Sequence, residues 1–137
     1  MTLPWIQKSE LDVTSLTTAM NLSAVALVAP YAATITAVQY VPNNTQAGGI
    51  DVNHRMLSLY NRGSVAGTGT TRVATLDLTS AAAGGTLTNN VPSSLTLTAT
   101  TAFLTVAAGD VLEWESSMSA TGMNDPGGRV IITYSRI

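Results

Sequence analysis

The sequence holds one histidine, His54, so any chemistry that needs an imidazole base depends on that residue. A histidine base activates a nucleophile when an acidic group orients it and a hydroxyl lies within reach. Ser58 is the nearby hydroxyl at a matching position of the alternating pattern, and the chain has no Gly-x-Ser-x-Gly elbow. We therefore interpret His54 as a histidine at the start of a strand, beside a loop.

Glu113 and Glu115 are the acidic pair whose spacing is compatible with catalysis, since residues two apart share one face of a strand. Glycosidase carboxyl groups lie about 5 to 9 Å apart, a separation that such a pair satisfies. Glycosidases also line their clefts with aromatic residues, but Trp114 alternates to the opposite face and Trp5 lies far away in the sequence. The pattern favours two solvated carboxylates over a catalytic pair.

The sequence gives little support for a metal site or a phosphate-binding loop. Asp51, Asp77, Asp110 and Asp125 fall in four separate segments without the spacing of a calcium loop, and the absence of cysteine excludes thiolate ligands and disulfides. The glycine-rich segment 63–69 has no following lysine and opens no helix, so it predicts a turn. We expect no catalytic residues, no metal and no cofactor, and do not expect an enzyme.

The elements that would position these residues are short runs of alternating polar and apolar character. They are rich in Val, Ile and Thr and bounded by Gly, Asn and Pro, a pattern typical of β-strands. A change of phase near Ala37 and Val38 indicates a bulge or a switch of face. Trp114 and Tyr134 lie centrally in their runs and are predicted core aromatics. The expected strands cover 24–29, 33–41, 54–62, 71–79, 95–98, 103–106, 111–117 and 129–136.

Seven or eight strands separated by turns predict an all-β fold, a single-domain β-sandwich of jelly-roll type. Residues 21–137 form this domain, and residues 1–20 are expected to be an extended N-terminal arm. The apolar segment Leu3, Pro4, Trp5 and Ile6 lies in the arm outside any strand pattern. It either packs on its own domain or docks on a partner, capsid or neighbouring subunit. Deleting residues 1–12 is then expected to leave the sandwich folded.

The 137-residue chain has 10% charged residues, against about 25% in an ordinary soluble domain. Its large uncharged areas are either solvated Thr and Ser faces or surfaces covered by neighbouring subunits. Six basic residues against eight acidic ones, without clustering, argue against nucleic acid as a partner. The longest apolar stretch, 22–33, is about half a membrane span and is interrupted by Ser23 and Pro30, so no membrane partner is expected.

The C-terminal half contains two motifs, Leu-Thr-Val-Ala-Ala-Gly-Asp-Val-Leu-Glu-Trp at 104–114 and Pro-Gly-Gly at 126–128, before the final strand Val-Ile-Ile-Thr-Tyr at 130–134. The segment Ala-Thr-Ile-Thr-Ala-Val-Gln-Tyr-Val-Pro at 33–42 fits the same pattern. Together these segments resemble the small jelly-roll head decoration (cement) proteins of tailed bacteriophages, over residues 22 to 137.

The resemblance implies a structural virion protein, a capsid decoration protein that forms a homotrimer on the outer surface of the capsid. There it would stabilise the shell of major capsid protein, with no small-molecule substrate and no catalytic residues. The arm around Trp5 would then be a strap onto a neighbour or the shell. The alternative is a carbohydrate- or receptor-binding β-sandwich module of a phage fibre or tail, and an enzyme is the third possibility.

Overall fold

The computed structural model describes residues 5–50, 52–64, 67–79 and 85–137. Over these residues the chain forms ten β-strands and one 3₁₀ turn, η1 (Thr101–Leu104), and contains no α-helix. The strands are β1 (Ile6–Val13), β2 (Leu22–Val28), β3 (Ala33–Pro42), β4 (His54–Asn61), β5 (Thr71–Asp77), β6 (Ser93–Ser94), β7 (Thr96–Leu97), β8 (Thr105–Val106), β9 (Val111–Ser119) and β10 (Gly128–Arg136).

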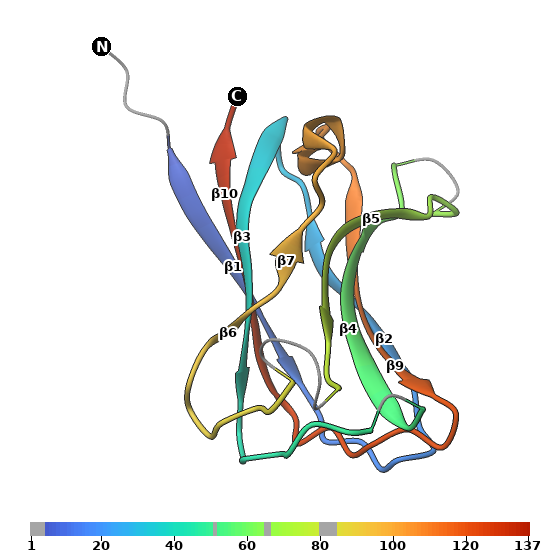
Figure 1. Cartoon of the computed structure of the whole chain (residues 1–137). Helices are drawn as coiled ribbons and strands as arrows, with labels where there is room; N and C mark the ends of the chain where they lie inside the picture. The colour runs from blue at the N-terminus through green and yellow to red at the C-terminus, as the bar shows by residue number, and fades with distance from the viewer. Residues whose placement is uncertain (1–4, 51, 65–66, 80–84) are drawn as a thin grey trace.

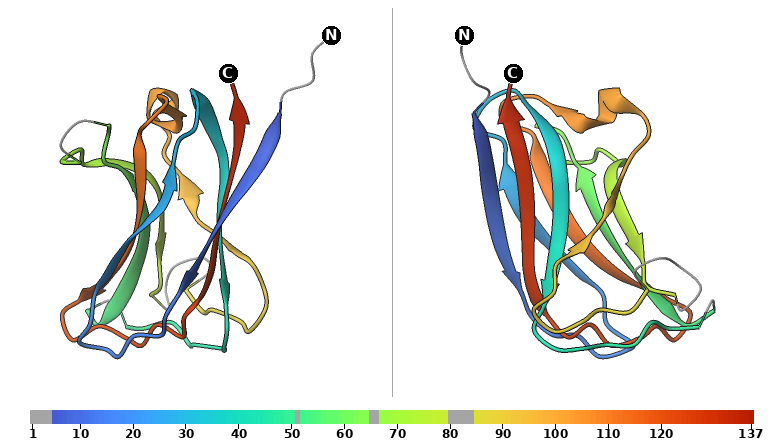
Figure 2. Two further views of the ribbon diagram at one scale, coloured as in Figure 1. Left: turned by 180° about the vertical axis from the view of Figure 1, so that it is seen from behind. Right: turned by 60° about the vertical axis from the view of Figure 1, so that its left-hand side comes forward.

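The strands form two antiparallel sheets that face each other (Figures 1 and 2). The first sheet has the order β1-β10-β3-β6, with β8 also paired to β3, and the second has the order β2-β9-β4-β5-β7. Consecutive strands lie in opposite sheets except for β4 and β5, which form a hairpin within the second sheet, and this arrangement is that of a jelly roll. The predicted all-β sandwich of jelly-roll type is confirmed.

The strand count exceeds the expected seven or eight because β1 is an additional strand and because one segment serves both sheets. Residues 93–106 contain three strands of two residues each, of which β6 and β8 pair with β3 while β7 pairs with β5. Backbone bonds continue this alternation, since Leu95 donates to Val38 at 2.9 Å and Thr98 donates to Val73 at 2.9 Å. This segment therefore spans the side of the sandwich that faces the viewer in Figure 1.

The N-terminal region departs from the expected arm over residues 1–20. Strand β1 runs antiparallel to β10 from the pair Ile6 and Ser135 to the pair Val13 and Gly128, so residues 6–13 are part of the first sheet. Its inward positions begin with Gln7 and Ser9, two polar residues that are only half-buried. A strand with such a mixed inner face has weak hydrophobic alternation, which is why the sequence pattern did not indicate it.

The core lies between the sheets and centres on Trp114, whose ring stacks on Tyr40 with 5.5 Å between ring centroids. Trp114 is fully buried and Tyr134 is 5% exposed, which confirms both predicted core aromatics. The predicted phase change is a β-bulge: the pairing of β10 with β3 passes from Ala37 directly to Ile35, so Thr36 is the extra residue. The bulge keeps the inward side chains of both halves of β3 in the core.

Candidate functional site

Of the residues predicted to bind a partner, Trp5 immediately precedes β1 and Ile6 begins it. Trp5 is 66% exposed and Ile6 is 68% exposed, although the Trp5 carbonyl accepts a hydrogen bond of 3.2 Å from the Arg136 backbone N–H. Leu3 and Pro4 lie outside the described residues. The backbone of Trp5 is therefore fixed to the sheet while its indole faces solvent, which disfavours the alternative that this side chain packs on its own domain.

The outer face of the first sheet is uncharged over β3 and the middle of β10. Along both strands, buried residues alternate with outward residues that are partly exposed. The charged residues of β10 are confined to its ends, at Arg129 and Arg136. The outward side chains are small, hydroxylated, amide or aliphatic: Thr34, Thr36, Gln39, Val41, Ile131, Thr133 and Ser135. We call these seven residues the uncharged face.

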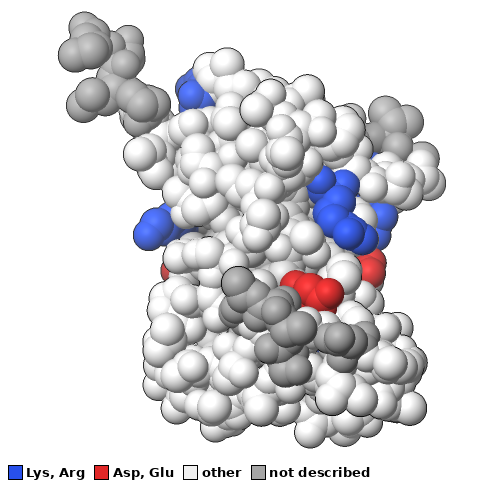
Figure 3. All heavy atoms as spheres, viewed as in Figure 1, with Lys and Arg blue, Asp and Glu red and all other residues white. Residues whose placement is uncertain are grey.

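Three of the charged residues beside the uncharged face gather at one corner of the sheet, whereas Lys8 lies opposite Thr133 and Arg136 lies at the other end of β10. The Arg129 guanidinium donates to the Asp12 carboxylate at 2.9 Å and contacts Glu10 at 3.3 Å. The hydrogen bond that Arg129 donates to Asp12, and then the charges of Asp12 and Glu10, raise the pKa of Arg129. Seen from the side shown in Figure 3, the charged residues form a few separate spots on a surface that is otherwise uncharged.

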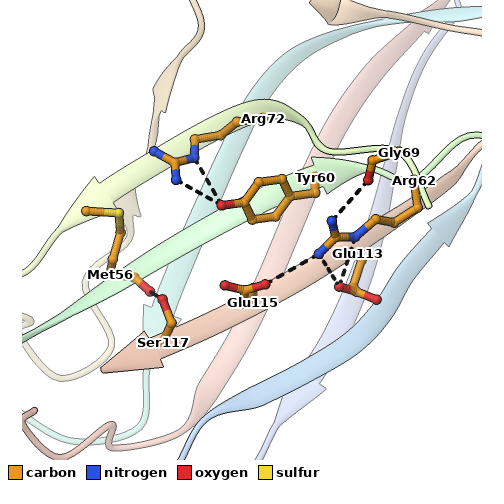
Figure 4. A network of polar contacts seen from close by, with 8 residues as sticks. All are labelled: Met56, Tyr60, Arg62, Gly69, Arg72, Glu113, Glu115 and Ser117. Carbon is orange, nitrogen blue, oxygen red and sulfur yellow. Dashed lines mark hydrogen bonds and ion pairs between the residues drawn. The ribbon is translucent and has the colours of Figure 1, made fainter. Parts of the chain in front are cut away.

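A second polar cluster lies on the outer face of the second sheet, where Arg62 binds both glutamates of β9 (Figure 4). Its Nη2 is 2.8 Å from Glu113 Oε1 and 3.4 Å from Glu115 Oε2, and its Nη1 donates to the Gly69 carbonyl at 3.0 Å. The two carboxylates considered as a catalytic pair thus share one guanidinium. Their arrangement is that of an ion-pair network within the sheet.

The same network includes the aromatic ring of Tyr60. Arg62 lies 4.5 Å and Arg72 5.4 Å from the ring centroid, and Arg72 donates to the Tyr60 hydroxyl at 2.9 Å. An open depression of about 470 Å³ adjoins this cluster, lined by Tyr60, Arg62, Thr70, Arg72 and Glu115. Arg62 lies over the Tyr60 ring and Arg72 holds its hydroxyl, so the Tyr60 side chain is part of this cationic cluster.

The remaining residues considered for a catalytic or metal site lie apart from one another in the structure. His54 Nε2 lies 3.4 Å from Asp77 Oδ1, whereas the Ser58 hydroxyl contacts the Thr75 hydroxyl at 3.4 Å. Asp110 accepts bonds of 2.9 Å from Asn61 and from the Ala107 backbone, which closes the turn before β9. Over the described residues no group of three or more His, Asp or Glu side chains could hold a metal ion. Asp51 lies outside them.

A buried polar network, which the sequence patterns did not reveal, joins the strands to the loops at one end of the sandwich. The Asp125 carboxylate accepts bonds of 2.6 Å from the Tyr40 hydroxyl, 2.6 Å from the Ser116 hydroxyl and 3.0 Å from the Gly127 backbone N–H. Arg55, also fully buried, donates to the Ser116 hydroxyl at 3.2 Å. Ser116 therefore connects a buried cation to a buried anion.

Arg55 extends this network to two loops, since it donates to the Met123 carbonyl at 2.9 Å and to the Thr17 carbonyl at 3.1 Å. Burial lowers the pKa of Arg55, and burial together with the charge of Asp125 raises the pKa of Tyr40. The inward orientation of Arg55 could have been predicted from the sequence, because residues 55, 57 and 59 alternate onto one face of the strand and the other two are Leu57 and Leu59. Asp125 lies in a loop, where no periodicity indicates burial.

Comparisons with known proteins give no family. No protein-family model and no curated protein matches the chain. Among solved structures, one titled as the structure of the infectious bursal disease virus Gx strain is similar at 11% identity and a TM-score of 0.39. The likeness covers 96% of this chain and 32% of that chain, so this chain spans about a third of its length. Over the described residues, no helix is long and apolar enough to cross a membrane.

Proposed function

We propose that this protein is a structural virion protein, a capsid decoration protein that forms a homotrimer on the outer surface of a capsid. Its role is to stabilise the shell of major capsid protein by contacting several subunits at once. The sequence resemblance to head decoration proteins of tailed phages leads to this proposal, and the jelly-roll fold agrees with it. The trimer, the capsid partner and the virion location belong to the proposal.

The observation that supports the proposal most is the uncharged face. Interfaces between subunits lose Lys, Glu and Asp at their centres and keep charge at their rims. The outward residues of β3 and the middle of β10 have this composition, with Arg129, Asp12 and Glu10 together at the corner. Such a face is suited to contact with another protein, whereas an exposed face usually has charges interspersed.

The exposed Trp5 and Ile6 supply a second contact in this proposal. Aromatic residues often contribute strongly at interfaces, and Trp5 presents its indole beyond the end of the sheet. Leu3 and Pro4 precede it in the sequence and extend the same apolar segment. Several modest contacts in each trimer would combine to give tight attachment to the shell.

The test adds purified protein to expanded phage capsids that lack their decoration protein, and measures bound protein and the temperature of capsid disruption. We expect saturable binding and a raised disruption temperature. Gln39→Lys places a charge in the uncharged face and should reduce binding at least tenfold. Ser117→Lys, at a half-buried outward position on β9, is the matched control and should bind as the wild type does. Absence of binding by the wild type would contradict the proposal.

A further inference from the structure

Over the described residues, β1 is the last strand of its sheet and pairs with β10, so its other edge has no strand partner (Figure 2). One side chain of β1 does reach the second sheet, since the Ser9 hydroxyl donates to the Ala26 carbonyl of β2 at 3.1 Å. The direction of its backbone groups follows from the bond of 3.2 Å that the Arg136 N–H donates to the Trp5 carbonyl. Bonded pairs alternate with non-bonded pairs in an antiparallel ladder, and the register from Ile6 to Val13 is unbroken. The N–H and C=O groups of residues 6, 8, 10 and 12 therefore point away from β10.

The outward side chains of β1 carry charge at three successive outward positions, a cation at Lys8 followed by anions at Glu10 and Asp12. Lys8 and Glu10 are both exposed and both lie on the outer face, opposite Thr133 and Ile131 of β10. Glu10 is 51% exposed and contacts Arg129 from one side. Within the described part of the chain, no ion pair involves Lys8. Each molecule thus presents one cation and two anions, at residues 8, 10 and 12, beside a row of available backbone groups.

We propose that two copies of this chain associate by antiparallel pairing of their β1 strands around a two-fold axis at Ser9. In this register, Lys8 of each copy lies directly opposite Glu10 of the other, so that one symmetric contact forms two opposite-charge pairs. Lys8 and Glu10 both have outward N–H and C=O groups, so each of these pairs is also a hydrogen-bonded pair of the new ladder. Opposite charges directly across an antiparallel pair stabilise it, whereas like charges destabilise it.

Registers shifted by one or two residues from this one are less favourable, because they bring like charges together or mismatch the backbone groups. A shift of two residues in one direction places Lys8 opposite Lys8 on the axis. A shift of two in the other direction pairs Lys8 with Asp12 but places Glu10 opposite Glu10 on the axis. A shift of one residue matches an outward-pointing backbone group with an inward-pointing one and exchanges the two faces of the strand. The register centred on Ser9 is thus the one that satisfies both the backbone and the charges.

This contact goes beyond the proposed capsid function and does not depend on it. A two-fold contact of one edge with itself is closed, so it joins two molecules and goes no further by itself. It uses the edge of β1 and leaves the uncharged face available to other neighbours. In a trimer, the same edges would join one trimer to the next.

The test uses a single cysteine, because the natural chain has none. In the proposed register, Ser9 faces Ser9 across a non-hydrogen-bonded pair, where Cα atoms lie about 4.5 Å apart, a distance that a disulfide can bridge. The full-length Ser9→Cys protein should form a covalent dimer under mild oxidation at least tenfold faster than Ser23→Cys. Ser23 is an exposed position on β2 and reports the rate of random collision.

Charge reversal in the Ser9→Cys background tests the register itself. Adding Glu10→Lys places Lys opposite Lys8 and should lower the cross-linking rate to that of Ser23→Cys. Exchanging both charges, with Lys8→Glu and Glu10→Lys together, should restore the fast rate. Melting temperatures show whether each variant is folded. The proposal is overturned if Ser9→Cys reacts no faster than Ser23→Cys, or if the charge changes leave its rate unaltered.

Discussion

At the scale of single residues, Asp125 is the side chain on which most of the buried polar network depends. It accepts three hydrogen bonds, from Tyr40, Ser116 and Gly127, and its backbone exchanges two bonds of 2.9 Å with Leu16. The carboxylate thereby connects β3 and β9 to its own loop, and the backbone of Asp125 connects that loop to the one containing Leu16. Its charge also compensates the buried cation of Arg55, with Ser116 between them.

Replacement of Asp125 by alanine is predicted to destabilise the fold strongly. The change leaves the Arg55 cation buried without compensation, which typically costs about 3–5 kcal/mol. Urea denaturation of the two proteins measures the difference in the free energy of unfolding. Asp12→Ala is the control: it removes a carboxylate with 78% side-chain exposure and should change stability by less than about 1 kcal/mol. Equal losses in the two variants would contradict this role of Asp125.

The raised pKa of Tyr40 predicts how the free energy of unfolding changes at alkaline pH. Burial and Asp125 raise its pKa in the folded protein, while a tyrosine in the unfolded chain ionises near pH 10. Above about pH 10 the unfolded state therefore releases a proton that the folded state retains, and the free energy of unfolding falls as pH rises. Tyr40→Phe should be less stable at pH 7 because it loses the bond to Asp125, but its stability should fall less between pH 9 and pH 11.

Urea denaturation of both proteins over this range gives the two slopes. The pKa of Tyr134 is also raised, mainly by burial, so a smaller decline persists in the variant. The same slope in wild type and Tyr40→Phe would show that Tyr40 is not the group responsible.

At the scale of elements, the junction of β10 with β3 depends on a glycine at the start of β10. A Cβ on Gly128 would lie 2.1 Å from the Val41 carbonyl oxygen, inside the ladder that joins the two strands. Gly128→Ala should therefore force the strands apart. Gly63→Ala is the control, because Gly63 has φ of +76° and open space around its Cβ position, so the change adds only backbone strain of about 1–2 kcal/mol.

Thermal unfolding measures both glycine variants. We expect Gly128→Ala to lower the melting temperature at least twice as much as Gly63→Ala does. The reverse order would mean that β10 and β3 can separate at this end at little cost.

The N-terminal deletion also needs a different prediction now that β1 is part of the sheet. Removing residues 1–12 takes away nearly all of β1 and exposes the ladder edge of β10, so we expect the melting temperature to fall by about 10 °C or more. Removing residues 1–5 takes away Trp5 but leaves β1 paired. That shorter deletion should preserve the melting temperature and weaken attachment to capsids. An unchanged melting temperature after removal of 1–12 would show that β1 contributes little.

The contrast between the strands explains what the sequence could predict. Strands β3, β9 and β10 have one face in the core and one outside, so Leu, Val and Trp alternate with Thr, Ser and Glu along them. The hydrophobic alternation of β1 is weak because Gln7 and Ser9 face inward at the edge of the sandwich. The sequence therefore did not predict that β1 pairs with β10. The side-chain hydrogen bonds of Arg55 and Asp125 join residues up to 85 positions apart in the sequence, Tyr40 and Asp125, and no local pattern indicates such contacts.

At the scale of the whole molecule, many of the few charged residues lie in compact groups rather than evenly over the surface. Several of the charged residues form compact groups, one around Arg129 and one around Arg62, and two more are buried at Arg55 and Asp125. The surface between these groups includes the uncharged face. A protein with this distribution is suited to having neighbours on that face, and the proposed homotrimer is one arrangement that covers it.

Light scattering of the purified chain tests the homotrimer most directly. The account predicts a mass of three chains, each of 14.2 kDa, at a concentration low enough that contacts between trimers dissociate. Gln39→Lys should lower this mass if the uncharged face is the trimer contact, and should keep it if that face binds the capsid. A wild-type mass of one chain would contradict the account, and a mass of two chains would replace the trimer with the β1 contact alone.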